Sequence, residues 1–180
     1  AIVIAYCTGA GHTRRLAQDI AIGAGAGAAL VDVETLTDTD WPRFHAARAI
    51  VFGAPTYMGS AAAAFKAFMD ASSDFWADQP WLDKIAAGFT VGSSPAGDKG
   101  NTLSELSVFA AQHGMIWVGQ SEIGPPTRHF EAGEPVLNRD GFNLGLAATS
   151  SRDKSELIGA DDLATARLFG ARIAAATARW

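Results

Sequence analysis

The sequence has few of the residues that mark several common classes of protein. Only one cysteine occurs among 180 residues, so no intramolecular disulfide can form, and this usage favours a reducing compartment. Charged residues make up only 18% of the chain, and 14 Lys and Arg face 19 Asp and Glu. With a formal net charge of −5, the chain lacks the excess of positive charge that binding along a nucleic-acid phosphate backbone requires. We therefore expect no nucleic-acid partner.

Long apolar runs and a secretory leader are missing as well. No stretch reaches the roughly 20 apolar residues of a membrane helix. The apolar start, residues 1–6, has no basic leader and meets a glycine turn at once. We therefore expect a cytoplasmic protein without membrane contact. Its length and its 48% of hydrophobic residues suit a single domain over residues 1–180 with a sizeable core.

What the sequence does contain is an alternation of apolar runs and helical patterns. Apolar runs predict five buried strands, at 1–6, 29–35, 49–54, 85–91 and 115–118, and Pro55 is expected to end the third. Helices are predicted over 12–26, over 61–71, from an Asn101 cap to His113, and from an Asp161 cap onward. This order favours an α/β fold, a doubly wound parallel sheet with helices on both faces.

The loops beyond the carboxyl ends of the strands are the expected ligand site of such a sheet. They span 7–13, 55–60, 92–100 and 119–150, and they are the segments richest in Gly, Ser, Thr and Pro. The last of these is predicted to be one long irregular loop. A loop of that length in a compact domain is usually functional.

The turn after the first strand has the composition of a phosphate site. Glycine lets the backbone close around an anion, threonine adds hydroxyl donors, and a helix N-terminus presents unpaired N–H groups. The candidate binding residues are Thr8, Gly9, Ala10, Gly11, His12 and Thr13. An ordinary glycine-containing turn between a strand and a helix would look the same. A Walker loop is excluded because no lysine precedes Lys66, and the dinucleotide fingerprint is excluded because Arg14 stands where its third glycine belongs.

Cys7 allows a second reading of the same turn. A cysteine followed after five residues by an arginine is typical of a phosphatase loop, in which the thiolate attacks phosphorus. Here six residues separate Cys7 from Arg14, which rotates the arginine by about 100° along the helix. The alternative is a small, partly buried residue that ends a strand.

Two further loops suit the edge of a flat heteroaromatic ring. The first combines rigid backbone with apolar faces, and the second offers N–H groups that could stabilise a reduced, anionic ring. The candidate residues are Pro55, Thr56, Tyr57, Met58 and Gly59 in the first, and Gly92, Ser93, Ser94, Pro95 and Gly97 in the second. Without a ligand, Tyr57 and Met58 would simply cover the core. Asp98 and Lys99 are expected to be exposed charges of a solvated loop.

Histidine and tryptophan supply the remaining candidates. His113 ends a predicted helix, where a cation is favourable in itself, and above a ring it could assist protonation of a quinone oxygen. Trp76 and Trp81 lie in a segment, 72–83, whose aromatic content predicts an interface or a ligand wall. The four histidines form no cluster with metal-ligand spacing, so we expect no metal site.

The three loops together resemble those of the flavodoxin-like FMN proteins. Within that group the chain is similar to the WrbA family of NAD(P)H:quinone oxidoreductases over essentially its whole length. The family pattern is matched by residues 53–59, 65–70, 75–76, 112–115 and 164–170. Ala10 departs from it, because some members carry an aromatic residue there, and residues 138–143 replace a stretch richer in glycine and tyrosine.

The resemblance implies a five-stranded sheet of order 2-1-3-4-5 and an FMN enzyme that passes two electrons from NADH or NADPH to a quinone. By the same resemblance, Thr8 to Thr13 hold the phosphate, residues 56–58 line the isoalloxazine, and residues 92–97 contact the ring and ribityl chain. It further implies catalytic-site roles for Trp76, often across a subunit boundary, and for His113 over the flavin. Family members are typically cytosolic tetramers, so we expect a homo-oligomer. An electron-carrying flavodoxin is the alternative function, although −5 is a weak charge for that role.

Overall fold

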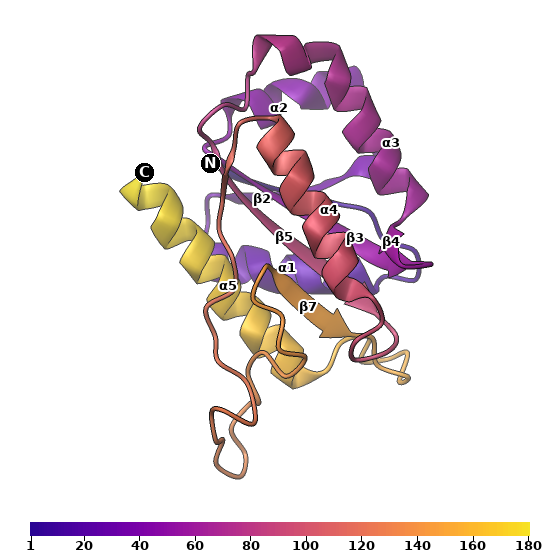
Figure 1. Cartoon of the computed structure of the whole chain (residues 1–180), viewed down its shortest axis with the longest axis vertical. Helices are drawn as coiled ribbons and strands as arrows, with labels where there is room; N and C mark the ends of the chain where they lie inside the picture. The colour runs from indigo at the N-terminus through magenta and orange to yellow at the C-terminus, as the bar shows by residue number, and fades with distance from the viewer.

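A computed structural model describes all residues from 1 to 180 as a sheet with helices on both faces (Figure 1). The strands are β1 (Ile2–Tyr6), β2 (Ala28–Asp32), β3 (Ala49–Tyr57), β4 (Ser60–Ala61), β5 (Ile85–Gly92), β6 (Ile116–Trp117) and β7 (Leu146–Thr149). The α-helices are α1 (His12–Ala24), α2 (Trp41–Ala46), α3 (Ala63–Ala71), α4 (Lys99–Gln112) and α5 (Ala160–Arg179). Short 3-10 helices are η1 (Val33–Thr35), η2 (Asp38–Asp40) and η3 (Ser72–Asp78).

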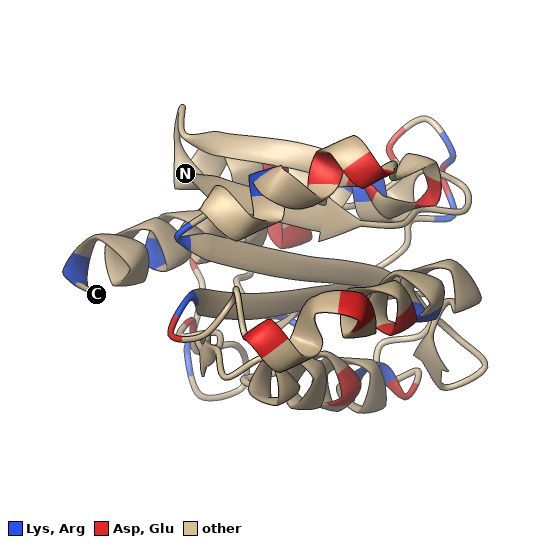
Figure 2. Cartoon of the chain, turned by 90° about the horizontal axis from the view of Figure 1, so that it is seen from above, with Lys and Arg blue, Asp and Glu red and all other residues tan.

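The central sheet is parallel, with strand order β2-β1-β3-β5-β6, which confirms the predicted doubly wound α/β fold. The alternation of side chains in β1 explains why both faces must be covered. Val3 and Ala5 join the core beneath α2, α3 and α4, whereas Ile2 and Ile4 join the core beneath α1 and α5. A continuous apolar run is stable only in such a doubly covered strand. Figure 2 shows acidic and basic residues interspersed over the elements around it.

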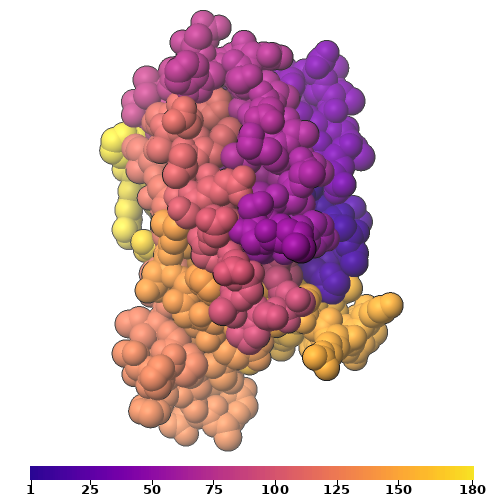
Figure 3. All heavy atoms as spheres, turned by 45° about the vertical axis from the view of Figure 1, so that its right-hand side comes forward, coloured from indigo at the N-terminus to yellow at the C-terminus, as the bar shows by residue number.

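The fifth strand is split into two pieces. β6 pairs with the start of β5 through Ile85 and Ile116, and β7 pairs with the end of β5 through Phe89 and Leu146. Residues 118–145 between them form an insertion, which Figure 3 shows as an orange lobe projecting from the lower end of the molecule. The prediction of one strand over 115–118 followed by a loop to 150 was therefore wrong. A four-residue run containing two alanines carries no period that separates strand from loop.

The third strand continues through Pro55 to Tyr57, so the prediction that this proline ends it was wrong. β1 ends opposite Gly53. Beyond that point no residue of β1 pairs with β3, so the amide hydrogen that Pro55 lacks removes no hydrogen bond between these two strands. β3 then turns back into β4 through Met58 and Gly59, whose φ angles of 50° and 90° suit a two-residue hairpin. The predicted helix over 61–71 begins only at Ala63 for this reason.

Two other predicted helix starts shift because the side chains expected to cap them bind elsewhere, and the second strand ends earlier than predicted. Asn101 donates to the carbonyl of Gly59 at 2.7 Å, and α4 begins two residues earlier, at Lys99. Asp161 accepts the N–H of Val136 at 2.9 Å, and α5 begins at Ala160. The second strand ends at Asp32, whose carboxylate caps the 3-10 turn that follows.

Trp81 lies in the core, so the prediction that it marks an interface or a ligand wall was wrong. Its side chain is fully buried, and its ring packs against those of Phe44, Phe52 and Phe68. Because the segment before it is a 3-10 helix and turns, no helical period was present to reveal an inward-facing side.

Helices α1 and α5 approach so closely that glycine is needed on both. A Cβ atom at Gly23 would collide with the carbonyl of Arg167, and one at Gly170 would collide with the carbonyl of Ile20. Between the helices, the fully buried Asp19 accepts the Nε–H of Arg167 at 2.6 Å. Backbone contact of this kind cannot relax by moving one side chain.

We expect Gly170→Ala to lower the free energy of unfolding by about 2–3 kcal/mol, because two helices must separate to admit one methyl group. Urea unfolding followed by circular dichroism measures this change. Gly27→Ala is the matched control, since nothing lies within 4 Å of a Cβ at that position. Equal stability of the two variants would contradict the close approach of α1 and α5.

Candidate functional site

Three of the predicted loops meet at one hollow of about 230 Å³ at the carboxyl edge of the sheet. Its walls are Gly9, Ala10, His12, Thr13, Pro55, Thr56, Tyr57, Val91, Gly92, Ser93 and Ser150. Val91 and Ser150 were not predicted, the first because it belongs to the strand itself. Ser150 is the last residue of the predicted ligand loop 119–150, but it was not singled out, because its position depends on β7, after which its N–H donates to the carbonyl of Gly92 at 2.9 Å. The hollow is smaller than the roughly 300–1,000 Å³ typical of ligand pockets, so a larger ligand would extend out of it.

Not every predicted binding residue lines this hollow. The remaining ones flank it within the same loops: Thr8, Gly11, Met58, Gly59, Ser94, Pro95 and Gly97. Thr8 is buried, and its hydroxyl accepts the N–H of Arg14 at 3.3 Å. Met58 is fully exposed at the tip of the β3–β4 hairpin, because its turn conformation points it away from the sheet.

The turn between β1 and α1 presents an array of free backbone donors. The N–H groups from Gly9 to Thr13 donate to no atom of the chain. That of Thr8 is already bound to the carboxylate of Glu34 at 3.0 Å. Gly11 has φ 98°, a left-handed conformation that favours glycine, and it directs the chain into α1. Five free donors at the N-terminus of a 13-residue helix form a binding site for an anion such as a phosphate.

Tyr57 links this turn to the loop after β3. A Cβ atom at Gly9 would collide with the Tyr57 hydroxyl, so the glycine leaves the space in which the ring tip lies. The tyrosine is 52% exposed, and it presents an aromatic face beside the anion site. An anion-binding turn, an aromatic wall and a polar loop thus surround one hollow.

Comparison with known proteins identifies the family of this chain. Residues 2–127 match the family described as NADPH-dependent FMN reductase. The chain belongs to this family. A Pseudomonas aeruginosa protein named Flavodoxin FldP is 38% identical over 174 residues, covering 96% of this chain and 94% of that protein. An Archaeoglobus fulgidus protein named NAD(P)H dehydrogenase (quinone) is 29% identical, covering 96% and 95%.

A solved structure agrees with the family. The flavodoxin, WrbA-like protein from Agrobacterium tumefaciens superposes with a TM-score of 0.79 at 36% identity, covering 99% of this chain and 97% of that one. The resemblance to flavodoxin-like FMN proteins of the WrbA type is confirmed, and the expected cofactors, FMN with a nicotinamide nucleotide, agree with this family. The free N–H array fits the phosphate of FMN, and the half-exposed Tyr57 beside it fits a flat aromatic ring.

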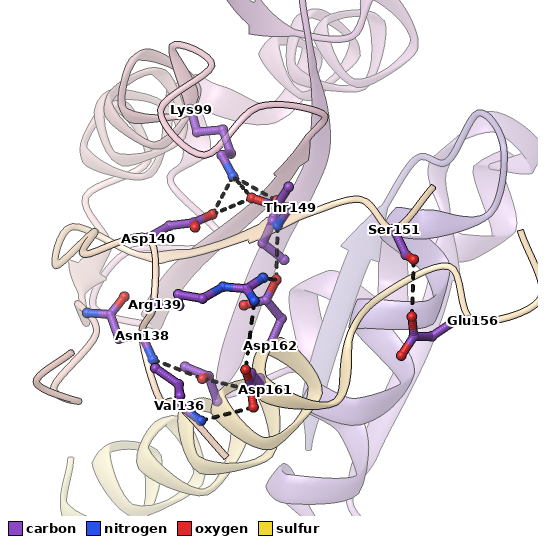
Figure 4. A network of polar contacts seen from close by, with 12 residues as sticks. Lys99, Val136, Asn138, Arg139, Asp140, Thr149, Ser151, Glu156, Asp161 and Asp162 are labelled. Carbon is purple, nitrogen blue, oxygen red and sulfur yellow. Dashed lines mark hydrogen bonds and ion pairs between the residues drawn. The ribbon is translucent and has the colours of Figure 1, made fainter. Parts of the chain in front are cut away.

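The loop after β5 is supported from below by a buried lysine, as Figure 4 shows. Lys99 is fully buried, and its Nζ donates to Asp140 at 2.6 Å and to the carbonyl of Ala148 and the hydroxyl of Thr149 at 3.0 Å each. Its methylene groups lie against Gly92, where a Cβ would stand 3.2 Å from Cγ. The expectation that Lys99 is an exposed loop charge was wrong.

The same network fastens the insertion to the rest of the fold. Asp140 belongs to the insertion, and it also accepts the Thr149 hydroxyl at 2.7 Å. The Thr149 N–H binds Asp162 of α5 at 3.0 Å, and burial raises the pKa of that carboxyl above its usual value. Asp140, one of the residues 138–143 that depart from the family pattern, therefore helps to support the loop after β5, residues 92–97.

Cys7 does not have the properties of a nucleophile. Its side chain is buried at the end of β1, and burial raises the pKa of the thiol to about 12. Arg14 is paired with Asp32 at 3.2 Å. A thiol that stays protonated at neutral pH contradicts the phosphatase reading.

Trp76 and His113 do not stand over the hollow of their own chain. α4 begins at Lys99, beside the hollow, and its 14 residues carry the chain about 21 Å to the opposite edge of the sheet (Figure 1). There the carbonyl of Gly114 accepts the N–H of Asp83, just before β5 begins. Both residues line a separate groove of about 770 Å³ along α3 and α4. Neither residue therefore lines the hollow of its own chain, so the roles that the resemblance implies, for Trp76 often across a subunit boundary, would need a second copy of the chain.

The surroundings of His113 explain its charge state. It is 2% exposed, its ring lies 4.3 Å from that of Trp81, and its Nε2 lies 2.9 Å from the Ser72 hydroxyl. Burial lowers the pKa of His113 to about 4, so it is neutral at pH 7 and is not the helix-terminal cation that its position suggested. Trp76 is 46% exposed, and its Nε1 donates to the carbonyl of Gln112 at 2.6 Å.

No group of three or more His, Cys, Asp or Glu side chains gathers where it could hold a metal ion. None of the helices combines the length and the apolar character needed to cross a bilayer.

Proposed function

We propose that the protein is an FMN-dependent oxidoreductase that passes two electrons from NADH or NADPH to a quinone. The observation that carries this proposal is the free N–H array of Gly9 to Thr13, which ends beside an aromatic wall at the carboxyl edge of the sheet. The family description and the quinone dehydrogenase from Archaeoglobus fulgidus support it.

Each part of the hollow has a separate task in this function. The N–H groups of residues 9–13 bind the phosphate, and the α1 dipole stabilises its charge. Tyr57 and residues 92–97 hold the isoalloxazine, with Met58 and Pro95 at its open side. Bound FMN supplies the hydride acceptance and release, so the chain needs no side-chain nucleophile. The open side leaves room for the nicotinamide and then the quinone to stack in turn.

Assembly is a second part of the proposal. Trp76 and His113 lie too far from their own hollow to contact its flavin, but the α3–α4 groove that they line is open. We place this groove against the hollow of another copy, in a dimer or tetramer located in the cytoplasm. Exposed Met58, Trp76 and Val108 are apolar side chains that such a contact would cover.

Reconstitution with FMN tests the reaction. The loaded protein is mixed anaerobically with excess NADH and, separately, with NADPH, while flavin absorbance is followed. We expect rapid bleaching without a semiquinone band, and steady-state oxidation of the nucleotide that depends on added quinone. Flavin that stays oxidised, or bleaching with no quinone-dependent turnover, would contradict the proposal. The faster donor identifies the nucleotide.

An electron carrier is the second candidate, favoured by the 38% identical relative named Flavodoxin FldP. A carrier passes single electrons, so its semiquinone would accumulate during reductive titration. The same anaerobic experiment with dithionite in place of the nucleotide distinguishes the two functions. Light scattering with and without FMN gives the oligomeric state.

A further inference from the structure

Three threonine hydroxyls form a chain that ends at the wall of the hollow. Thr56 lines the hollow, whereas Thr90 of β5 and Thr102 of α4 are fully buried behind it. The Thr56 oxygen lies 2.8 Å from the Thr90 oxygen and 2.8 Å from the Thr102 oxygen. Thr90 in turn lies 2.7 Å from the carbonyl oxygen of Ala54.

The direction of every hydrogen in this chain follows from the carbonyl at its end. A carbonyl oxygen can only accept, so the single hydroxyl hydrogen of Thr90 points to Ala54. Thr56 must then donate to Thr90, and Thr102 must donate to Thr56. The only hydrogen of the Thr56 hydroxyl is thus donated to Thr90. One lone pair of the Thr56 oxygen accepts from Thr102, and the other is free to accept a hydrogen bond from a ligand.

We propose that Thr90 is a positioning residue, which acts through Thr56 to make this wall of the hollow a hydrogen-bond acceptor. Such a wall selects a donor on the ligand and rejects an acceptor, since two lone pairs would otherwise face each other. The oxidised ring of FMN has one donor, N3–H, and the ribityl chain has its hydroxyls. The inference rests on the proposed binding of FMN at this hollow.

The chain contains a matched control for this role. Thr90→Val and Thr102→Val each remove one buried hydroxyl that touches Thr56. Only Thr90→Val frees the Thr56 hydrogen, which can then turn toward the hollow and take the place of the lone pair that faces the ligand. Thr102→Val leaves the Thr56 hydrogen on Thr90 and merely releases a second lone pair. A purely structural role would make the two variants equivalent.

Fluorescence titration of the apoprotein with FMN measures the difference. We expect Thr90→Val to weaken Kd by about tenfold, as for the loss of one hydrogen bond, and Thr102→Val by less than threefold. Thr90→Ser, which keeps the hydroxyl, is expected to restore Kd to within threefold. Titration with N3-methyl FMN identifies the donor: if it is N3–H, the wild type and Thr90→Val bind this analogue equally, and if it is a ribityl hydroxyl, the tenfold difference persists.

Urea unfolding of each variant shows whether the fold is kept. Equal weakening by Thr90→Val and Thr102→Val, or no weakening by either, would overturn the inference. If Thr90→Val does not fold, Thr90→Cys replaces it, and its weaker S–H donor is expected to give an intermediate Kd. Failure of the wild-type protein to bind FMN would instead overturn the proposed function, so the two failures are distinguishable.

Discussion

Asp140→Leu is expected to lower the free energy of unfolding by about 3–5 kcal/mol, the largest effect that we predict for a single substitution. The Lys99 and Asp140 side chains are 0% and 3% exposed, so water cannot replace the lost carboxylate. The ammonium would keep only the Ala148 carbonyl and the Thr149 hydroxyl as partners. The large loss of stability is expected because the buried Lys99 ammonium would no longer be paired with a carboxylate.

The paired variant Lys99→Met/Asp140→Leu is the control for this prediction. It removes both charges and fills similar volume, so we expect it to recover most of the lost stability. Urea unfolding of the wild type, both single variants and the double variant gives the coupling between the two side chains. Equal destabilisation by Asp140→Leu and the double variant would show that packing, not charge, supports the insertion.

FMN titration of the same variants connects this network to the site. Lys99 lies directly under Gly92, and Asp140 belongs to the insertion. Asp140→Leu is therefore expected to weaken FMN binding more than the double variant does. The insertion would then help to hold the loop after β5, residues 92–97, although it contributes no side chain to the hollow.

Acid is expected to destabilise the protein through His113 between about pH 6.5 and pH 4. The pKa of His113 is lowered from 6.5 to about 4 by burial, so the unfolded chain binds more protons in this window. The free energy of unfolding therefore keeps its full contribution from the neutral His113 ring above pH 6.5. This contribution is lost as the pH falls toward 4. Each pKa unit corresponds to 1.36 kcal/mol, so the total loss is about 3 kcal/mol.

His113→Gln tests this prediction, since an amide can still bind Ser72 but does not titrate. Its stability is expected to be lower than that of the wild type at pH 7 and to fall less steeply below pH 6.5. His129→Gln, the same change at an exposed histidine of the insertion, is the control for the substitution itself. Burial also lowers the pKa of His45, which therefore contributes to the slope that remains. An unchanged acid slope in His113→Gln would contradict the assignment.

Local patterns in the sequence were sufficient for the first four strands of the parallel sheet and for most residues of the hollow. The run at residues 2–6 is apolar on both sides of a strand, and only a doubly covered parallel sheet can bury it. The glycines and threonines that follow it are adjacent in the chain, so composition alone predicted that they share one turn at the edge of the hollow. The flanking loops follow neighbouring strands, and parallel strands bring their carboxyl ends together.

Contacts between residues far apart in the chain could not be recognised in this way. β7 was missed because its four residues become a strand only beside β5. Lys99 looks like a loop charge until Asp140, 41 residues later, is placed beside it. Pro55 looks like the end of a strand unless one knows that β1 has already stopped.

The sequence by itself therefore predicted the fold class and the loops that meet at the hollow, because burial and turn formation depend on near neighbours, and its combined motifs resembled the family. Only the tertiary structure decided where Trp76 and His113 lie and which side chains support the loop after β5, residues 92–97. It alone also decided in which direction the hydroxyl hydrogens of Thr56, Thr90 and Thr102 point. Those properties depend on where strands end, on the length of α4 and on distances between atoms of separate elements. No local pattern of residue types records such distances.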